Sequence, residues 1–171
     1  MGQEPIACRR GVTEAIVQRV GLKEQTLTIL LLEDDPHDVF FIQRAMEQAS
    51  VAHTLQAVAN GEEGIAYLRG DGPYSDRMKY PVPNIILTDI KMPRMDGFEF
   101  LHWLRHHPEW SVIPTIVLSS SSIDSDVRRA YEAGANAYLR KPSSQAELAE
   151  IIRITSKYWC MCERPPIITN W

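Results

Sequence analysis

The sequence predicts an α/β protein with a doubly wound parallel sheet of five strands and five helices. Short apolar runs alternate with longer amphipathic segments along the chain, and this alternation is typical of strands joined by helical crossovers. The first apolar run is continuous, as expected for a strand that is buried on both faces of a sheet. The 171 residues suffice for one domain with a substantial hydrophobic core.

The first two strand–helix units are expected between residues 26 and 69. A leucine-rich run over 26–32 predicts the first strand, which is followed by Glu33-Asp34-Asp35-Pro36. Asp35 suits the N-cap and Pro36 the first position of a helix that reaches about Ser50. Alternating residues over 53–58 predict the second strand, and residues 61–69 the second helix.

Three further units follow a loop over 70–83, which is rich in glycine, proline and charged residues. Strands are expected over 84–88, 115–118 and 137–139, and helices over 97–106 and 124–133. Gly134 suits the left-handed position that ends a helix. Ser144 and Glu147 have the spacing of a capping box, which begins a last helix that ends near Lys157.

Composition and charge exclude several classes of protein. A formal net charge of −4, with the arginines in small separate groups, gives no basic surface for nucleic acid. Three cysteines do not make a disulfide framework and fit a reducing compartment. No apolar stretch approaches the ~20 residues of a membrane span, so we expect a cytoplasmic protein that is not bound to a membrane.

Polar side chains follow four of the predicted strands. Glu33 and Asp34 follow the first, Asp89 the third, Ser119 the fourth and Lys141 the fifth. The carboxyl ends of parallel strands meet at one edge of such a sheet, so these groups should converge there. The sequence lacks the glycine-rich loops that bind nucleotide phosphates, and three close acids would repel one another unless Mg²⁺ or the lysine neutralises them. Asp89 is then a candidate acceptor of a phosphoryl group, forming an acyl phosphate.

These residues lie in motifs that resemble the receiver domain of two-component response regulators. The likeness covers 26–157 and rests on four segments: Leu30-Leu31-Leu32-Glu33-Asp34-Asp35-Pro36, Asp89 to Gly97, Ile116 to Ser121, and Ala133 to Pro142. It implies a flavodoxin-like (βα)5 receiver fold. Residues 1–25 would be an N-terminal extension, either a short helix or a disordered segment, and residues 158–171 a C-terminal tail.

The resemblance implies a role for each matching residue. Asp89 becomes the phosphorylation site, Ser119 and Tyr138 the switch pair, and Lys141 the lysine that binds phosphate. The expected Mg²⁺ site consists of Glu33, Asp34, Asp89 and the backbone carbonyl of Lys91. Lys91 and Ser121 occupy positions that tune dephosphorylation, and the bond between Lys141 and Pro142 is expected to be cis.

The resemblance also implies partners. A histidine kinase supplies the phosphoryl group, and the chain is no enzyme beyond its own phosphorylation and slow autodephosphorylation. Residues 158–171 are too few for a DNA-binding output module, so the signal should pass by contact to a downstream protein target or phosphotransfer protein.

A narrower likeness links the chain to the small single-domain regulators paired with phytochrome-type histidine kinases. It rests on the 70–83 loop and on the tail that begins at Tyr158-Trp159. It implies a bacteriophytochrome as kinase and a homodimer formed through the tail and the face made by residues 124–133, 137–139 and 145–157. Packing of the tail on its own domain is an open alternative.

Two other functions fit parts of the pattern. A haloacid-dehalogenase-like phosphatase also uses an aspartyl nucleophile after a buried strand, but it needs a second acid where this chain has Lys91. A receiver-like interaction module that is never phosphorylated is the stronger rival, and the presence of every required side chain argues against it.

Overall fold

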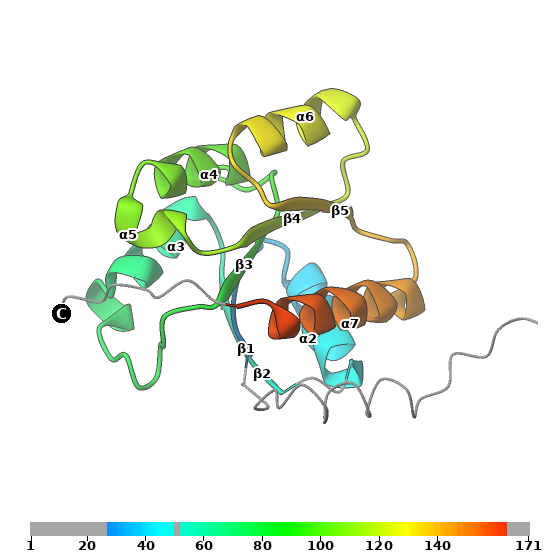
Figure 1. Cartoon of the computed structure of the whole chain (residues 1–171), viewed down its shortest axis with the longest axis horizontal. Coiled ribbons are helices and arrows are strands. Elements are labelled where there is room, and N and C mark those ends of the chain that lie inside the picture. Colours follow the sequence, from blue (N-terminus) through cyan, green and yellow to red (C-terminus); the bar gives the residue numbers. More distant parts are fainter. Residues whose placement is uncertain (1–26, 50–51, 164–171) are drawn as a thin grey trace, which may run out of the picture.

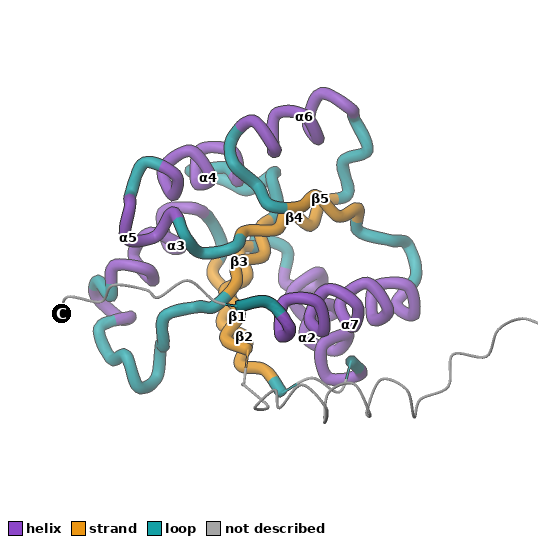
Figure 2. The backbone as a smooth tube through the Cα atoms, viewed as in Figure 1, coloured by secondary structure: helices purple, strands orange, loops and turns teal. Residues whose placement is uncertain are grey.

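The computed structural model describes residues 27–49 and 52–163. The predicted N-terminal extension and the end of the tail, residues 164–171, lie outside the described residues. The rest forms the predicted doubly wound architecture, a single parallel sheet between two layers of helices (Figures 1 and 2).

The sheet has five parallel strands in the order β2-β1-β3-β4-β5. Their bounds are β1 Leu27–Leu32, β2 His53–Val58, β3 Ile85–Thr88, β4 Thr115–Ser119 and β5 Ala137–Arg140. Each agrees with its prediction to within one residue at either end. Strands β1, β3 and β4 are central, and nearly all of their residues are buried. Burial on both faces explains why their sequences are continuously apolar.

Alternate residues of β1 point into different cores. Ile29 and Leu31 pack under α2 (Pro36–Gln48) and α7 (Gln145–Met161), whereas Leu30 and Leu32 pack under α3 (Gly61–Arg69) and α4 (Gly97–Arg105). A third cluster joins α4 to α6 (Asp124–Glu132) above β4. Figure 1 shows α2 and α7 together on one side of the sheet and α3, α4 and α6 on the other.

The predicted helix starts hold at the level of single side chains. The Asp35 carboxylate caps α2 by accepting from the N–H of His37, and Pro36 is the first helical residue. Ser144 caps α7 by accepting from the N–H of Glu147, which is one of the two hydrogen bonds of the predicted capping box. Gly134 has a φ of 98°, the left-handed conformation expected after α6.

The 70–83 loop packs against α3. The Arg77 guanidinium donates to the carbonyls of Tyr67 and Leu68, which lie in the last turn of α3. The rings of Tyr67, Tyr74 and Tyr80 lie together in tilted and edge-to-face pairs. A short 3₁₀ helix, η1 (Gly72–Tyr74), brings Tyr74 into this group.

The structure differs from the prediction in the number and length of its helices. The described residues contain six α-helices instead of five, because a single turn, α5 (Pro108–Ser111), follows α4. Pro108 begins that turn and the buried side chain of Trp110 anchors it. Helix α7 continues to Met161, past the predicted end at Lys157, since Trp159 and Cys160 pack against the core under α2 and α7. None of the helices in the described ranges is long and apolar enough to cross a membrane.

Candidate functional site

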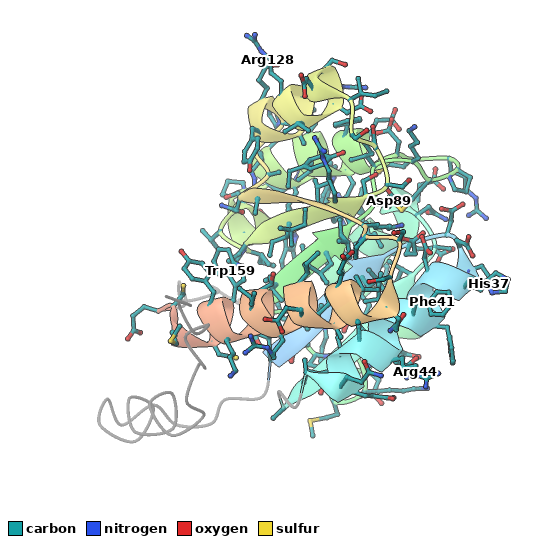
Figure 3. The ribbon with its side chains drawn as sticks, turned by 90° about the vertical axis from the view of Figure 1, so that its right-hand side faces the viewer. His37, Phe41, Arg44, Asp89, Arg128 and Trp159 are labelled. Atoms are coloured by element: carbon teal, nitrogen blue, oxygen red, sulfur yellow. The ribbon has the colours of Figure 1, made fainter. Side chains whose placement is uncertain are left out.

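The carboxyl ends of the strands bring the predicted residues to one edge of the sheet. Glu33 follows β1, Asp89 follows β3, Ser119 ends β4 and Lys141 follows β5. Asp89 and His37, at the start of α2, lie at one end of the molecule, and Trp159 lies at the other (Figure 3). The convergence follows from the parallel order of the strands, as predicted.

The ammonium group of Lys141 is the centre of the cluster. Its Nζ donates to Glu33 Oε2 at 2.5 Å, to Asp38 Oδ2 at 2.6 Å and to Asp89 Oδ2 at 3.0 Å. The side chain of Lys141 is 12% exposed, that of Glu33 2% and that of Asp89 9%. An ammonium has three donors, so each N–H of Lys141 is paired with one carboxylate.

Burial and charge act in opposite directions on these groups. Burial alone lowers the pKa of Lys141, but its bonds to Asp38 and Glu33 and the charge of Asp89 outweigh burial and raise the pKa above its usual value. Burial raises the pKa of Glu33, although the ammonium of Lys141 opposes that shift. Lys141 therefore stays charged, and the carboxylates depend on it for compensation.

Backbone contacts fix Asp89 against its neighbours. Its Oδ1 accepts from the N–H of Ile90 at 2.6 Å and from that of Lys91 at 3.4 Å, while its own N–H donates to the carbonyl of Leu32. Gly97 passes so close to this turn that a Cβ there would lie 2.1 Å from the Asp89 carbonyl oxygen. The Asp89–Gly97 loop is thus compact, and its last residue must be glycine.

The other side of the site lies in the loop after β4. Ser119 is fully buried, and its Oγ accepts from the N–H of Ser121 at 3.4 Å. Ser121 Oγ donates to Asp126 Oδ2 at 2.6 Å. The hydroxyl of Tyr138, on β5, donates to the Ser121 carbonyl at 3.0 Å. The structure thus brings the two predicted switch residues together through Ser121.

The residues proposed to hold Mg²⁺ supply oxygen donors only. Asp34 is exposed at the end of β1, and the N–H of Lys91 contacts the carboxylate of Asp89, which places its peptide beside that group. Carboxylate and carbonyl oxygens are the donors that Mg²⁺ prefers, so the set fits. Among the described residues no three acidic, histidine or cysteine side chains form a ready metal site, so the carbonyl of Lys91 would be needed as a ligand. Glu33, which is also predicted to contribute to the Mg²⁺ site, is paired with Lys141.

One predicted feature is wrong and one residue was missed. No peptide bond in the described ranges is cis, so the bond between Lys141 and Pro142 is trans. The trans form is intrinsically favoured before proline by about 0.5–1 kcal/mol, and Lys141 reaches all three carboxylates from it.

Asp38 was not predicted as part of the site. Its position four residues after Asp34, in the first turn of α2, was the available signal.

Comparisons with known proteins agree with this geometry. A family model described as the response regulator receiver domain matches residues 29–153. The probable methanogenesis regulatory protein FilR2 of Methanothrix harundinacea is 32% identical over 146 residues, 84% of this chain and 90% of that protein. Response regulator Rcp1 of Synechocystis is 31% identical over 131 residues, 77% of this chain and 87% of Rcp1.

Solved structures give the same result. The phosphorylated cyanobacterial phytochrome response regulator RcpA superposes with a TM-score of 0.75 at 31% identity, covering 83% of this chain and all of RcpA. RPA3017, a response regulator in red light signalling of R. palustris, gives 0.78 at 33% identity, with 82% and 99% covered. The Mn²⁺-bound form of Rcp1 gives 0.72 at 30% identity, with 82% and 99% covered.

The family model spans most of the chain, and the strand order, the buried Asp89 and the Lys141 cluster lie within the matched residues. Receiver domains of this family partner with histidine kinases and are generally not classical enzymes themselves. The chain belongs to the response regulator receiver domain family.

Proposed function

We propose that this chain accepts a phosphoryl group on Asp89 from a phosphohistidine of a histidine kinase, in a reaction that depends on Mg²⁺. The observation that carries the proposal is the buried ammonium of Lys141, 3.0 Å from Asp89 Oδ2. A fixed positive charge at that distance can stabilise the phosphoryl oxygens during transfer and afterwards.

The transfer exchanges one bond to phosphorus for another. A carboxylate oxygen of Asp89 attacks, the P–N bond of the phosphohistidine breaks, and its electron pair returns to the imidazole nitrogen of the kinase. The backbone N–H groups of Ile90 and Lys91 hold the Asp89 carboxylate in place through Oδ1. Mg²⁺, held by Asp34, Asp89 and the Lys91 carbonyl with Glu33 beside them, would supply positive charge for the phosphoryl oxygens.

Loss of the phosphoryl group is the second reaction of this site. Attack of water on phosphorus would break the P–O bond to Asp89 and release inorganic phosphate. Lys91 is exposed beside Asp89, and we propose that it tunes this hydrolysis. Ser121 is proposed to do so from the loop after β4, where Asp126 now binds its hydroxyl.

Phosphorylation would be read out through Ser119 and Tyr138. The phosphoryl group adds charge and acceptor oxygens at Asp89, and the hydroxyl of Ser119 is proposed to move toward them. Ser119 Oγ accepts a hydrogen bond from the N–H of Ser121, and Ser121 in turn accepts one from the hydroxyl of Tyr138. A movement of Ser119 would therefore act on Tyr138 through Ser121. Tyr138 lies half-buried between α4 and α6, and a change in its position would alter this face.

The same face is proposed to form a homodimer and to contact a downstream protein target or phosphotransfer protein. Edge strand β5 lies between α6 and α7 (Figure 1). These helices expose large apolar side chains, namely Tyr131, Ile154, Tyr158 and Met161. Light scattering should show a dimer that Ile154→Asp converts to a monomer, and a monomeric wild-type protein would contradict the dimer.

A bacteriophytochrome is the proposed kinase, and the cytoplasm the proposed compartment. RcpA and RPA3017 are named for phytochrome and red light signalling, and both match nearly their whole length. Phosphotransfer profiling against the histidine kinases of the same organism tests this. Preferential transfer from a kinase without a phytochrome module would contradict it.

The decisive test is labelling by a small phosphodonor in the presence of Mg²⁺. Wild-type protein should form an acyl phosphate that hydroxylamine cleaves, and Asp89→Asn should form none while keeping its circular dichroism spectrum. Asp71→Asn is the matched control, because Asp71 is exposed and makes no capping hydrogen bond. Undiminished labelling of Asp89→Asn would contradict the site. Absence of any labelling, and of any response to beryllofluoride, would favour an interaction module that is not phosphorylated.

A further inference from the structure

The ammonium of Lys141 has a third partner that does not come from the end of a strand. Glu33 and Asp89 follow β1 and β3, but Asp38 belongs to the first turn of α2. The Lys141–Asp38 contact of 2.6 Å is shorter than the Lys141–Asp89 contact of 3.0 Å. Lys141 is therefore closer to Asp38, on α2, than to Asp89, the proposed phosphoryl acceptor.

Asp38 is also the most exposed of the three acids. Its side chain is 38% exposed, against 2% for Glu33 and 9% for Asp89. Water can therefore solvate the Asp38 carboxylate when Lys141 leaves it, whereas Glu33 has no such compensation. The bond to Asp38 is the one that Lys141 can give up at the lowest cost.

Phosphorylation of Asp89 increases the number of negatively charged oxygens that can accept hydrogen bonds from the Lys141 ammonium. Phosphorylated Asp89 carries about −2 charge in place of the −1 charge of its carboxylate, and it adds acceptor oxygens beside a cation that also pairs with Glu33 and Asp38. All three N–H donors of Lys141 are occupied, so a bond to a phosphoryl oxygen requires that an existing one be released or shared.

We propose that Asp38 is a positioning residue that holds Lys141 toward α2 and competes with the phosphoryl oxygens for its ammonium, so that it favours the unphosphorylated state. This inference rests on the proposed function of Asp89. Asp38 acts through Lys141 and does not itself touch the transferred group.

Beryllofluoride binding at saturating Mg²⁺ tests whether Asp38 competes with the phosphoryl oxygens for Lys141. Asp38→Asn removes the charge and keeps the shape of the side chain, so it should bind beryllofluoride about two- to fivefold more tightly than wild type, the range expected for a partly exposed charge. Asp38→Ser should change affinity in the same direction. Glu47→Gln, on the exposed far end of α2, is the control for net charge and should bind as wild type does.

A second measurement follows Lys141 directly, without Mg²⁺ or beryllofluoride. The ¹⁵N signal of the Lys141 ammonium should shift in Asp38→Asn and stay in place in Glu47→Gln. Unchanged or weaker beryllofluoride binding by both Asp38 variants, or an unshifted Lys141 signal, would overturn the inference. A wild-type protein that binds no beryllofluoride would overturn the proposed function and the competition with it, and the Lys141 signal would still decide whether Asp38 holds the ammonium.

Discussion

The Tyr138 hydroxyl donates a hydrogen bond of 3.0 Å to the backbone carbonyl of Ser121 and thereby joins edge strand β5 to the loop after β4. Ser121 also donates its N–H to Ser119 and its hydroxyl to Asp126. One residue therefore connects both members of the proposed switch pair with the first turn of α6. The conformation of this loop and the position of Tyr138 are not independent.

Removing the Tyr138 hydroxyl should weaken this connection without emptying the core. We expect Tyr138→Phe to lower the free energy of unfolding by about 0.5–1 kcal/mol, because the ring still packs between α4 and α6 and only one partly buried hydrogen bond is lost. Urea denaturation measures the change. Tyr131→Phe is the control, since its hydroxyl only accepts a longer, exposed bond of 3.3 Å from the N–H of Tyr138. A larger loss in Tyr131→Phe would contradict the assignment.

The sequence predicted the sheet well because its signals are local. Each central strand is a continuous apolar run, and the polar residues that follow the strands mark the edge where the site forms. The convergence of Glu33, Asp89 and Lys141 then follows from parallel strand order alone.

The features that the sequence did not reveal depend on tertiary contacts. Helix α5 is only one turn long, which is too short for a periodic spacing of apolar residues to predict it. The side chain that anchors it, Trp110, is buried but does not belong to such a spacing. The contact of Asp38 with Lys141 joins residues 103 positions apart, and an acid in the first turn of a helix has a local explanation in the helix dipole. The isomer of the bond before Pro142 is set by a difference too small to infer from residue types.

Arg105 should contribute more to stability than an exposed arginine does. Its guanidinium donates to Gly134 O at 2.9 Å, to Asn136 Oδ1 at 3.2 Å and to the carbonyls of Ser111 and Ile113, and burial lowers its pKa. It thus ties the segment after α4 to the turn before β5. We expect Arg105→Met to lower the free energy of unfolding by about 2–4 kcal/mol in urea denaturation, because it removes the donor to the carbonyls of Gly134 and Ser111. Ile113 O and Asn136 Oδ1 would still accept from Thr115.

Arg128→Met is the matched control for Arg105→Met. Arg128 forms an exposed pair with Glu132 one turn along α6 and projects from the surface (Figure 3). Its loss should cost less than about 1 kcal/mol. If Arg105→Met and Arg128→Met lower the free energy of unfolding equally, the hydrogen bonds of Arg105 stabilise the fold no more than an exposed arginine does.

Gly97 should not tolerate even a methyl group. A Cβ at this position would lie 2.1 Å from the Asp89 carbonyl oxygen and 2.8 Å from the Cα of Ile90, and both are backbone atoms that cannot rotate away. We expect Gly97→Ala to lose about 2 kcal/mol or more of unfolding free energy, measured in urea, and to reduce labelling of Asp89, since the loop must shift.

Gly72→Ala separates this steric effect from the effect of backbone conformation. Nothing lies within 4 Å of a Cβ at Gly72, but its φ is 55°. The cost there should be about 1 kcal/mol, with labelling unchanged. A variant at Gly97 that is as stable as the one at Gly72 would contradict the proposed clash.

The pH dependence of stability should reveal the burial of Glu33. Burial raises the pKa of Glu33 above its ordinary value of 4.5, so the folded chain holds this proton more tightly than the unfolded chain does. The stabilisation from protonated Glu33 is complete below pH 4.5 and is lost as the pH rises through the folded-state pKa.

The variant Glu33→Gln tests this pH dependence, because glutamine cannot titrate and keeps an oxygen that can accept from Lys141. The stability of this variant relative to wild type should therefore increase as the pH is raised from about 4 to 7. Urea denaturation at several pH values measures the trend, with Glu47→Gln as the exposed control on α2. A relative stability that falls over this range would mean that Lys141 outweighs burial, and that the pKa of Glu33 is lowered in the folded protein.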